Sequence, residues 1–287
     1  MTARTRGGAP ISGQATEHSI GKVKNIIAVA SGKGGVGKST SSVNLAYALK
    51  ASGSRVGLLD ADIYGPSLSL MTKIGRPDGT SGQMIIPPEV DGIKVISVAM
   101  FAMDKQAQIL RGPMVSQIIR QFLTQIEWGD LDYLLIDYPP GTGDIQLTLS
   151  QLAPITGAVI ITTPQEVALL DVRRAAHMFH TMKVPVLGVI ETMSYFLCDG
   201  CDKKHYIFRK GGGKKVANEL GVPLIAEVPI DPSVSAGSDS GDPVVKRIPE
   251  SSVGKAYIEA AGGVASQQSI VNLENAGALQ QFSLVWQ

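Results

Sequence analysis

The sequence has few cysteines, few aromatic residues and no long apolar run, and its net charge is close to zero. Two cysteines in 287 residues cannot form a disulfide framework, so we expect a cytoplasmic protein whose thiols stay reduced. No apolar run approaches the roughly 20 residues that span a bilayer, and we therefore expect no membrane partner. Lysine and arginine total 26 against 25 aspartate and glutamate residues, so the charge gives no reason to expect a nucleic-acid partner.

Both ends of the chain differ in composition from the middle. Residues 1–23 lack the apolar centre of a secretory signal, and we predict a flexible leader there. Residues 263–287 are small and polar up to "FSLVW", and we predict a loosely attached tail. Residues 24–262 contain neither an internal repeat nor a clear linker, and they are long enough to bury a large core. We therefore predict one domain over this range.

Glycine-rich turns and short apolar runs dominate the middle of the chain. The runs "IIAVA" at 26–30, "DYLLID" at 132–137 and "GAVIITT" at 157–163 are continuous rather than alternating, which is typical of strands covered on both faces. Segments with a helical pattern separate them. The sequence therefore predicts an α/β fold with a mostly parallel sheet and helices on both faces, whose ligands bind at the carboxyl ends of the strands.

A glycine-rich loop follows the first of these runs. The segment "SGKGGVGKST" at 31–40 has the spacing G-x-x-x-x-G-K-S and stands between an apolar strand and a helix, as the phosphate loop of a P-loop NTPase requires. Its backbone N–H groups must approach phosphate oxygens, and a Cβ would often block them. Lys38 is expected to hold the β- and γ-phosphates of ATP, and Ser39 to ligate Mg²⁺. The nucleotide-binding residues expected in this loop are Gly32, Lys33, Gly34, Gly35, Val36, Gly37, Lys38, Ser39 and Thr40.

Three aspartates stand at the ends of predicted strands. Asp137 ends "DYLLID" and is placed to support Mg²⁺ through water, and "PPGTGD" follows it, in which Gly141 is placed to sense the γ-phosphate. Asp60 and Asp62 end "RVGLLDAD", and one of them can orient the attacking water. A lone aspartate at a strand end is commonly a cap or turn residue. Beside a phosphate loop, however, we assign functions to Asp62 and Asp137.

Both cysteines lie in one short segment, "LCDGC" at 197–201. Cys198 and Cys201 have the C-x-x-C spacing of a redox pair, of half a zinc site or of half an iron–sulfur site. A redox pair normally opens a helix early in a small fold, which this segment does not do. His205 lies close enough in the sequence to be considered as a third zinc ligand. The residues alone leave zinc and iron–sulfur chemistry both open.

Lys33 is a second lysine in the loop, which a plain phosphate loop does not need. With it, "KGGVGKST" resembles the deviant Walker A motif of the ATPase class that includes MinD, ParA, the nitrogenase iron protein and the Mrp-type carriers. The resemblance implies that Lys33 reaches across a dimer to the nucleotide of the partner. The expected catalytic residues are then Lys33, Lys38 and Asp62.

Further segments extend this likeness over residues 24–245. They include "LLDADIYGPS", "DYLLIDYPPGTGD", "TGAVIITTPQEVALLD" and "VPVLGVIETMSYFLCDGC". Together they resemble the Mrp (ApbC-like) iron–sulfur cluster carriers. The resemblance implies a cytoplasmic, homodimeric ATPase that slowly hydrolyses ATP and works with scaffold proteins and recipient apoproteins. Thr192 departs from the family, in which many members have an asparagine associated with the adenine base.

Two copies of the chain would supply four thiolates around a twofold axis, and four thiolates suit a [4Fe–4S] cluster. With the resemblance, this predicts a cluster bound by Cys198 and Cys201 of both copies in a homodimer. The basic run at 203–215 can stabilise a negatively charged cluster or meet an acidic recipient protein. The alternatives are a positioning ATPase of the MinD or ParA type, which leaves the C-x-x-C unexplained, and a zinc-binding or redox C-x-x-C protein.

Overall fold

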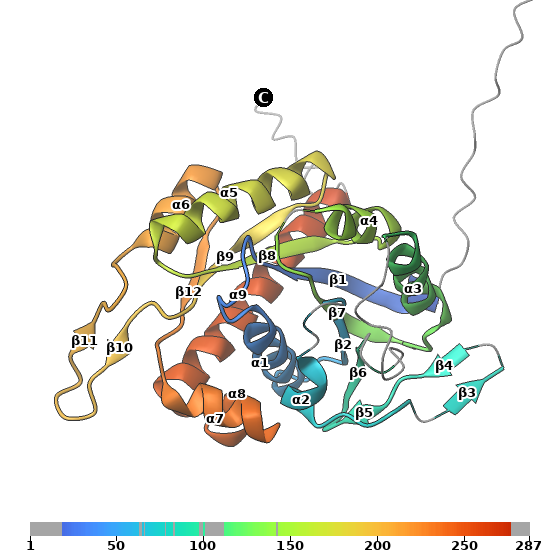
Figure 1. The fold of residues 1–287 in the computed structure, drawn as a ribbon, viewed down its shortest axis with the longest axis horizontal. Coiled ribbons are helices and arrows are strands. Elements are labelled where there is room, and N and C mark those ends of the chain that lie inside the picture. Colours follow the sequence, from blue (N-terminus) through green and yellow to red (C-terminus); the bar gives the residue numbers. More distant parts are fainter. Residues whose placement is uncertain are drawn as a thin grey trace, which may run out of the picture.

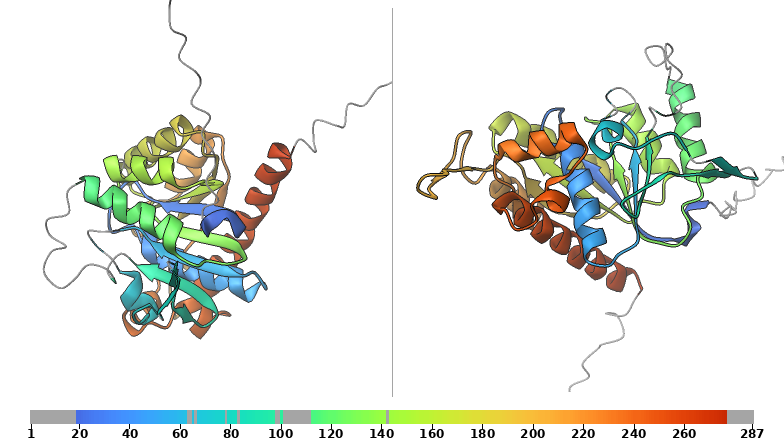
Figure 2. Two further views of the ribbon diagram at one scale, coloured as in Figure 1. Left: turned by 90° about the vertical axis from the view of Figure 1, so that its right-hand side faces the viewer. Right: turned by 90° about the horizontal axis from the view of Figure 1, so that it is seen from below.

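The computed structural model is shown in Figure 1, and Figure 2 adds two further views. It describes residues 19–62, 65, 67–77, 79–82, 84–97, 100, 112–141 and 143–276. Of the predicted leader, residues 1–18 lie outside the described residues, and Ser19–Lys22 form a 3-10 helix, η1. Of the predicted tail, residues 277–287 lie outside them as well.

An eight-stranded sheet forms the centre of the part of the chain that the structure describes. Its strand order is β12-β9-β8-β1-β7-β2-β6-β5, and every neighbouring pair is parallel except β5–β6. The strands are β1 (Val23–Ala30), β2 (Val56–Asp60), β5 (Glu89–Val90), β6 (Ile93–Ser97), β7 (Leu131–Asp137), β8 (Gly157–Thr162), β9 (Val186–Glu191) and β12 (Leu224–Glu227). The continuous apolar runs of the central strands bury both faces of the sheet.

Helices cover both faces of the sheet (Figures 1 and 2). They are α1 (Lys38–Ala51), α2 (Leu68–Thr72), α3 (Gly112–Gln125), α4 (Asp144–Leu152), α5 (Glu166–Thr181), α6 (Gly212–Leu220), α7 (Pro232–Ser240), α8 (Val244–Arg247) and α9 (Ser252–Asn275). Along β1, Ile27 and Val29 face the core under α1 and α9, whereas Ile26 and Ala28 face the core under α3 and α4. This arrangement confirms the predicted α/β fold.

Among the described residues, two short antiparallel hairpins lie outside the main sheet. One pairs β3 (Gly79–Ser81) with β4 (Met84–Ile86), and the other pairs β10 (Phe196–Leu197) with β11 (Lys204–His205). The β10–β11 hairpin follows β9, carries both cysteines and extends away from the body of the protein (Figure 1). None of the described helices is long and apolar enough to cross a membrane.

Helix α9 does not stop at residue 262, where we expected the domain to end. It continues to Asn275, and Val264 in its second half is buried. The Asn272 side-chain amide donates a hydrogen bond to Asn25 Oδ1 of β1 at 2.8 Å. Composition hid this helix because a helix that packs on one face needs a buried residue only about once a turn, and its other residues stay small or polar.

Replacing Val264 tests how firmly the second half of α9 is packed. We expect Val264→Ala to lower the free energy of unfolding by about 2 kcal/mol, because buried apolar groups are lost and a cavity remains. The matched control on the same helix is Ile270→Ala, whose side chain is 43% exposed, and we expect a change within about 0.5 kcal/mol. Urea unfolding measures both values, and equal effects would contradict the packing of this segment.

Candidate functional site

The predicted phosphate loop connects β1 to α1. Gly35 and Gly37 have φ angles of 76° and 79°, a left-handed conformation that residues with a Cβ rarely adopt. Gly37 is also the N-cap of α1, and having no side chain it leaves the N–H groups at this end of the helix without a cap from the N-cap position. Uncapped N–H groups at a helix N-terminus favour the binding of an anion. The local backbone is therefore suited to hold phosphate oxygens.

A pocket of about 310 Å³ lies at this loop. The predicted loop residues that line it are Lys33, Gly34, Gly35, Gly37, Lys38, Ser39 and Thr40. Asp62 and Pro140 line it as well. The other two predicted loop residues support the loop instead. Gly32 packs against Asp171 of α5 so closely that a Cβ added to Gly32 would lie 2.2 Å from the Asp171 Cβ. Val36 is buried in the core.

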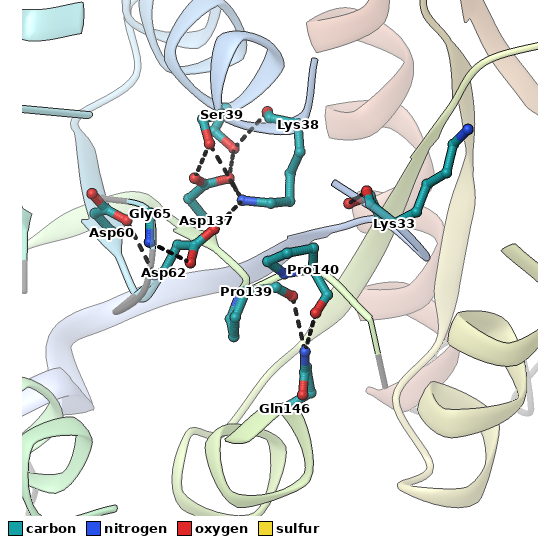
Figure 3. Close-up of polar contacts among 12 residues, drawn as sticks. Lys33, Lys38, Ser39, Asp60, Asp62, Gly65, Asp137, Pro139, Pro140 and Gln146 are labelled. Atoms are coloured by element: carbon teal, nitrogen blue, oxygen red, sulfur yellow. Dashed lines mark hydrogen bonds and ion pairs between the residues drawn. The ribbon is translucent and has the colours of Figure 1, made fainter. Parts of the chain in front are cut away.

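Asp137, at the end of β7, is fully buried beside the loop (Figure 3). Its Oδ1 lies 2.9 Å from the Lys38 ammonium and accepts a hydrogen bond from Ser42 at 2.7 Å, and its Oδ2 accepts one from Ser39 at 2.6 Å. A buried carboxylate needs a cation and hydrogen-bond donors to compensate its charge, and α1 supplies all three partners. The sequence prediction missed Ser42, although it stands one helical turn after Lys38 on the same face.

The two aspartates at the end of β2 have different surroundings. Asp60 is fully buried, and its carboxylate accepts hydrogen bonds from the Ser97 hydroxyl and the Asp62 N–H. Asp62 lines the pocket, 3.8 Å from the Lys38 ammonium, and accepts a hydrogen bond from the Gly65 N–H. Of the two aspartates considered for orienting water, the structure thus brings Asp62 to the pocket and places Asp60 behind it.

The segment after β7 is tied to the phosphate loop by hydrogen bonds. The Gly141 N–H donates to the Ser31 carbonyl at 3.1 Å. The Gln146 amide donates to the carbonyls of Pro139 and Pro140 at 3.2 and 2.6 Å (Figure 3). The sequence prediction gave no role to Gln146, because a glutamine inside a helix has no distinguishing pattern. This glutamine fixes the segment that carries the predicted γ-phosphate sensor.

Lys33 is half-buried, and its side chain points away from Lys38 and Asp137 (Figure 3). The Ser31 hydroxyl donates to the Lys33 carbonyl at 2.9 Å, which fixes the backbone of this residue but not its side chain. The ion pairs at the pocket join Lys38 to Asp62 and Asp137, and none of the described carboxylates pairs with Lys33. Its ammonium is therefore directed out of its own site.

Thr192 lies directly after β9 and contacts the phosphate loop. Its buried hydroxyl is 2.6 Å from the Val36 carbonyl and 2.8 Å from the Thr162 carbonyl. A hydroxyl has one proton, so it donates to one of these carbonyls at a time. The side chain at this position therefore supports the backbone of the loop.

Cys198 and Cys201 lie in a tight turn between β10 and β11. The N–H groups of Cys201 and Asp202 donate to the Cys198 carbonyl at 3.4 and 2.9 Å, and the Cys198 N–H donates to the Lys203 carbonyl at 3.1 Å. Cys198 is half-buried, Cys201 is exposed, and both are free thiols. Hydrogen bonds from the Gly200 N–H and from Cys201 hold the pKa of Cys198 below its ordinary value, which favours the thiolate.

The described residues of one chain do not complete a metal site at this turn. Within the described ranges, no group of three or more His, Cys, Asp and Glu side chains is placed to hold a metal ion. His205, the third zinc ligand considered from the sequence, is exposed in β11 and does not join the two cysteines. Binding a metal through four thiolates therefore requires ligands from a second molecule.

The site combines a glycine-rich loop between β1 and α1 with a lysine and a serine at the start of the helix. Carboxylates at the ends of β2 and β7 face this loop, and together these features define a known class of protein. The protein is a P-loop NTPase. Residues 22–265 match the ParA family model, described as NUBPL iron-transfer P-loop NTPase, and the chain belongs to this family. The match confirms the resemblance to the iron–sulfur carrier ATPases that the sequence motifs indicated.

Known proteins agree with this assignment. The chain is 47% identical over 256 residues to the iron-sulfur cluster carrier protein of Pseudomonas fragi, which covers 88% of this chain and 89% of the relative. A nucleotide-binding protein of Archaeoglobus fulgidus in complex with ADP has a TM-score of 0.70 at 40% identity, covering 78% of this chain and 88% of that one. The septum site-determining protein MinD of Pyrococcus horikoshii, complexed with Mg-ADP, has a TM-score of 0.66 at 25% identity, covering 86% and 98%.

Asp60 makes the stability of the protein depend on pH. Burial and, second to it, the negative charge of Asp137 raise the pKa of Asp60 from 3.8 to about 7. Between about pH 4 and 7 the folded protein therefore holds a proton that the unfolded chain has released, so the free energy of unfolding falls as the pH rises. We expect Asp60→Asn to remove the part of this decrease in the free energy of unfolding that is due to Asp60, because the amide does not titrate.

Urea unfolding between about pH 4 and 8, without nucleotide or Mg²⁺, measures this dependence. The matched control is Asp239→Asn on α7, where the side chain is exposed and the wild-type dependence should persist. An Asp60→Asn protein whose stability falls as steeply as the wild type would show that another group is responsible.

Proposed function

We propose that the protein is an ATP-dependent carrier of iron–sulfur clusters. It binds and slowly hydrolyses ATP, holds a [4Fe–4S] cluster between two copies of the chain, and passes the cluster to apoproteins after receiving it from scaffold proteins in the cytoplasm. One observation carries the proposal: a phosphate pocket and a turn of two free thiols stand on the same chain, and the described residues do not complete the metal site.

The pocket fits ATP with Mg²⁺. The phosphates would meet the Lys38 ammonium and the uncapped N–H groups of α1. The Ser39 hydroxyl lies against Asp137, with Asp62 nearby, and these are the hard oxygen donors that Mg²⁺ prefers. Bound Mg²⁺ would supply charge neutralisation on the phosphates. Two relatives hold ADP, one of them with Mg, which supports this fit.

Four residues of the chain have roles in hydrolysis under this proposal. Lys38 stabilises charge on the transferring phosphate, and Asp62, which lines the pocket beside it, orients the attacking water. Lys33 reaches the nucleotide of the second copy, and the direction of its side chain away from its own site supports this role. Gly141 senses the γ-phosphate through the segment that is hydrogen-bonded to the phosphate loop.

The thiols fit a cluster as cargo. Soft thiolates are the usual ligands of iron–sulfur clusters, and the lowered pKa of Cys198 favours that form. Two chains related by a twofold axis provide two pairs of thiolates, the number that a [4Fe–4S] cluster takes. The relative from Pseudomonas fragi is named an iron-sulfur cluster carrier protein, which supports the same cargo here.

A short segment connects the nucleotide pocket to the cysteines. Thr192 contacts the phosphate loop, and Cys198 follows it six residues later. Between them the Ser194 hydroxyl donates to Glu191 at 2.6 Å, and the same carboxylate accepts the Gly213 N–H on the other side of the hairpin. In this proposal ATP binding changes the position of the hairpin in each copy, and hydrolysis is thereby coupled to delivery of the cluster.

A positioning ATPase of the MinD type is the second candidate, and the structural likeness to the Pyrococcus horikoshii protein favours it. Such a protein uses the same phosphate loop and dimer. It gives no part to Cys198 and Cys201, whereas a carrier uses both the pocket and the thiols. Metal analysis therefore separates the two candidates.

Anaerobic reconstitution with iron and sulfide tests the cluster site. We expect about four irons per dimer, and loss of the cluster in Cys198→Ala and Cys201→Ala, because each variant removes two of the four thiolates from a dimer. Asp199→Asn, which changes the same turn but keeps both thiols, is the matched control. Iron and sulfide assays with the mass measured in the same sample give the result. Bound zinc instead of iron, a cluster retained by Cys198→Ala, or a loaded monomer would contradict the proposal.

Lys38→Ala tests the coupling to ATP. We expect hydrolysis to fall about a hundredfold, because one charged contact to the phosphates is lost, and delivery of a preloaded cluster to fall with it. Lys50→Ala, at the exposed end of the same helix, is the control that keeps both activities. Because Lys38→Ala leaves the buried carboxylate of Asp137 without its cation, circular dichroism is used to check that the variant is folded. If it is unfolded, Lys38→Arg, which keeps a cation at this position, takes its place. Delivery at the wild-type rate by folded, loaded Lys38→Ala would refute the coupling.

A further inference from the structure

An exposed apolar cluster lies next to the cysteine turn. Tyr206, Ile207 and Phe208 follow β11 directly and are 36%, 58% and 46% exposed. Adjacent large apolar side chains on a surface, rimmed by polar residues, are typical of a site of interaction. Four lysines accompany them, and we use the name hairpin patch for Lys203, Lys204, Tyr206, Ile207, Phe208, Lys210 and Lys214.

Contacts within the hairpin hold the patch in place. The Tyr206 ring packs edge-on against Tyr195, with the ring centroids 6.4 Å apart. The Lys204 ammonium lies 4.0 Å from the centroid of Tyr195, and the Lys210 ammonium lies 5.0 Å from that of Tyr206. A cation–π contact orders a lysine beside a ring without cancelling its charge. The patch therefore presents positive charge, ordered at Lys204 and Lys210, together with apolar surface.

The positive charge of the patch is not neutralised by the described part of the chain. Glu166 of α5 pairs with Arg209 at 2.6 Å and with Lys215 at 3.0 Å. The four patch lysines pair with none of the described carboxylates. Asp199 and Asp202 are the two acidic residues of the segment 198–215, which has six lysine and arginine residues. A positive surface of this kind selects an acidic partner.

We propose that the hairpin patch is the docking surface for an acidic recipient protein whose contact face has an apolar centre ringed by carboxylates. The proposal rests on the proposed carrier function. Apolar anchors surrounded by a polar rim are the usual anatomy of a specific interface, and complementary charge steers the encounter. Cys198 and Cys201 lie in the same hairpin, so a protein that docks here has its own thiols next to the cluster.

Charge and position argue against two other occupants. In the proposed dimer the cysteine turns of two copies meet at the cluster, and the like charges of the two hairpin patches disfavour direct contact between the patches, which leaves them open to a partner beside the cluster. An anionic lipid surface would match the charge, but it would cover the cysteine turn and hide the cluster from the recipient. An acidic protein both matches the charge and is the molecule that needs access to the cluster.

Docking at this place permits transfer by ligand exchange. Each bond from iron to a carrier thiolate breaks as a bond from iron to a recipient thiolate forms, four for four, and the cluster keeps its oxidation state. The protons that the recipient thiols lose pass through solvent to the released carrier thiolates. No oxidant or reductant is required.

Binding of a fluorescently labelled apoferredoxin of the bacterial type, a small acidic acceptor, tests the apolar part of the patch. The carrier is used without cluster, so that binding is measured apart from transfer. We expect Ile207→Ser/Phe208→Ser to raise the dissociation constant about tenfold or more, as removal of central anchors does. The matched control is Ile270→Ser/Leu273→Ser on α9, where both side chains are exposed, and we expect a change of less than about twofold.

Charge reversal tests the rim. We expect Lys203→Glu/Lys210→Glu to slow association with apoferredoxin about tenfold in about 50 mM NaCl, and the difference to shrink in about 500 mM NaCl, where surface charges are screened. Lys22→Glu/Arg76→Glu makes the same change in net charge at exposed positions on other elements and serves as the control. Equal slowing in the control would show that net charge alone matters and would overturn the proposal.

Iron content, dimer mass and transfer rate, measured on each variant, separate this proposal from the carrier function. A wild type that binds no cluster while the patch variants lose binding would refute the carrier function and leave the docking surface standing. Variants that bind apoferredoxin and transfer clusters like the wild type would overturn the docking surface alone. A change in dimer mass in the patch variants would also overturn the docking surface. So would binding to vesicles of about 30% phosphatidylserine that depends on Phe208 and that apoferredoxin does not displace.

Discussion

The buried carboxylate of Asp137 is the constraint on which the nucleotide site depends. It lies at the end of a central strand without exposure to water, and Lys38, Ser39 and Ser42 compensate its charge. Removing one partner of a buried ion pair typically costs about 3–5 kcal/mol, so this contact fixes the start of α1 at the end of β7. The loop between β1 and α1 then has to close in the few residues available, which requires the left-handed Gly37. A bound phosphate would compete with Asp137 for the Lys38 ammonium. Binding of the ligand would therefore change the contacts of Asp137 at the end of β7, directly before the segment that contains Gly141.

The same edge of the sheet also supports the cysteine hairpin. The strand β9 ends beside the phosphate loop, and the chain leaves the sheet through Thr192 and Ser194 before it reaches β10. It returns at α6, where Gly212 packs so closely on Pro164 that a Cβ would lie 2.4 Å from the carbonyl oxygen. Glu191 contacts both the outgoing and the returning segment. The hairpin is therefore anchored at both ends within a few residues of the nucleotide loop, although its tip lies away from the body of the protein.

Much of this arrangement follows from local patterns in the sequence. Continuous apolar runs predict parallel strands, and the carboxyl ends of parallel strands meet at one edge, so the joint position of Lys38, Asp62 and Asp137 could be predicted. Gln146 could not, because its role depends on the path of a loop rather than on spacing. The burial of Val264 was hidden by the small and polar residues around it, since a helix can pack with few apolar positions. The roles of Gln146 and Val264 depend on which residues surround them and on whether they are buried. Both are properties of the fold and cannot be read from the spacing of residue types in the sequence.

The incompleteness of the thiol site is consistent with the function we propose for it. A site with four ligands on one chain would hold its metal with a strength that depends only on that chain. Cys198 and Cys201 of one chain would supply half of such a site, so under this proposal retention of the cluster would depend on the association of two copies and hence on their concentration. A nucleotide that bridges the copies through Lys33 would then alter cluster affinity without touching the cysteines. Under this proposal the separation of the two sites on the chain would not oppose their coupling, because both would act on the same equilibrium between one copy and two.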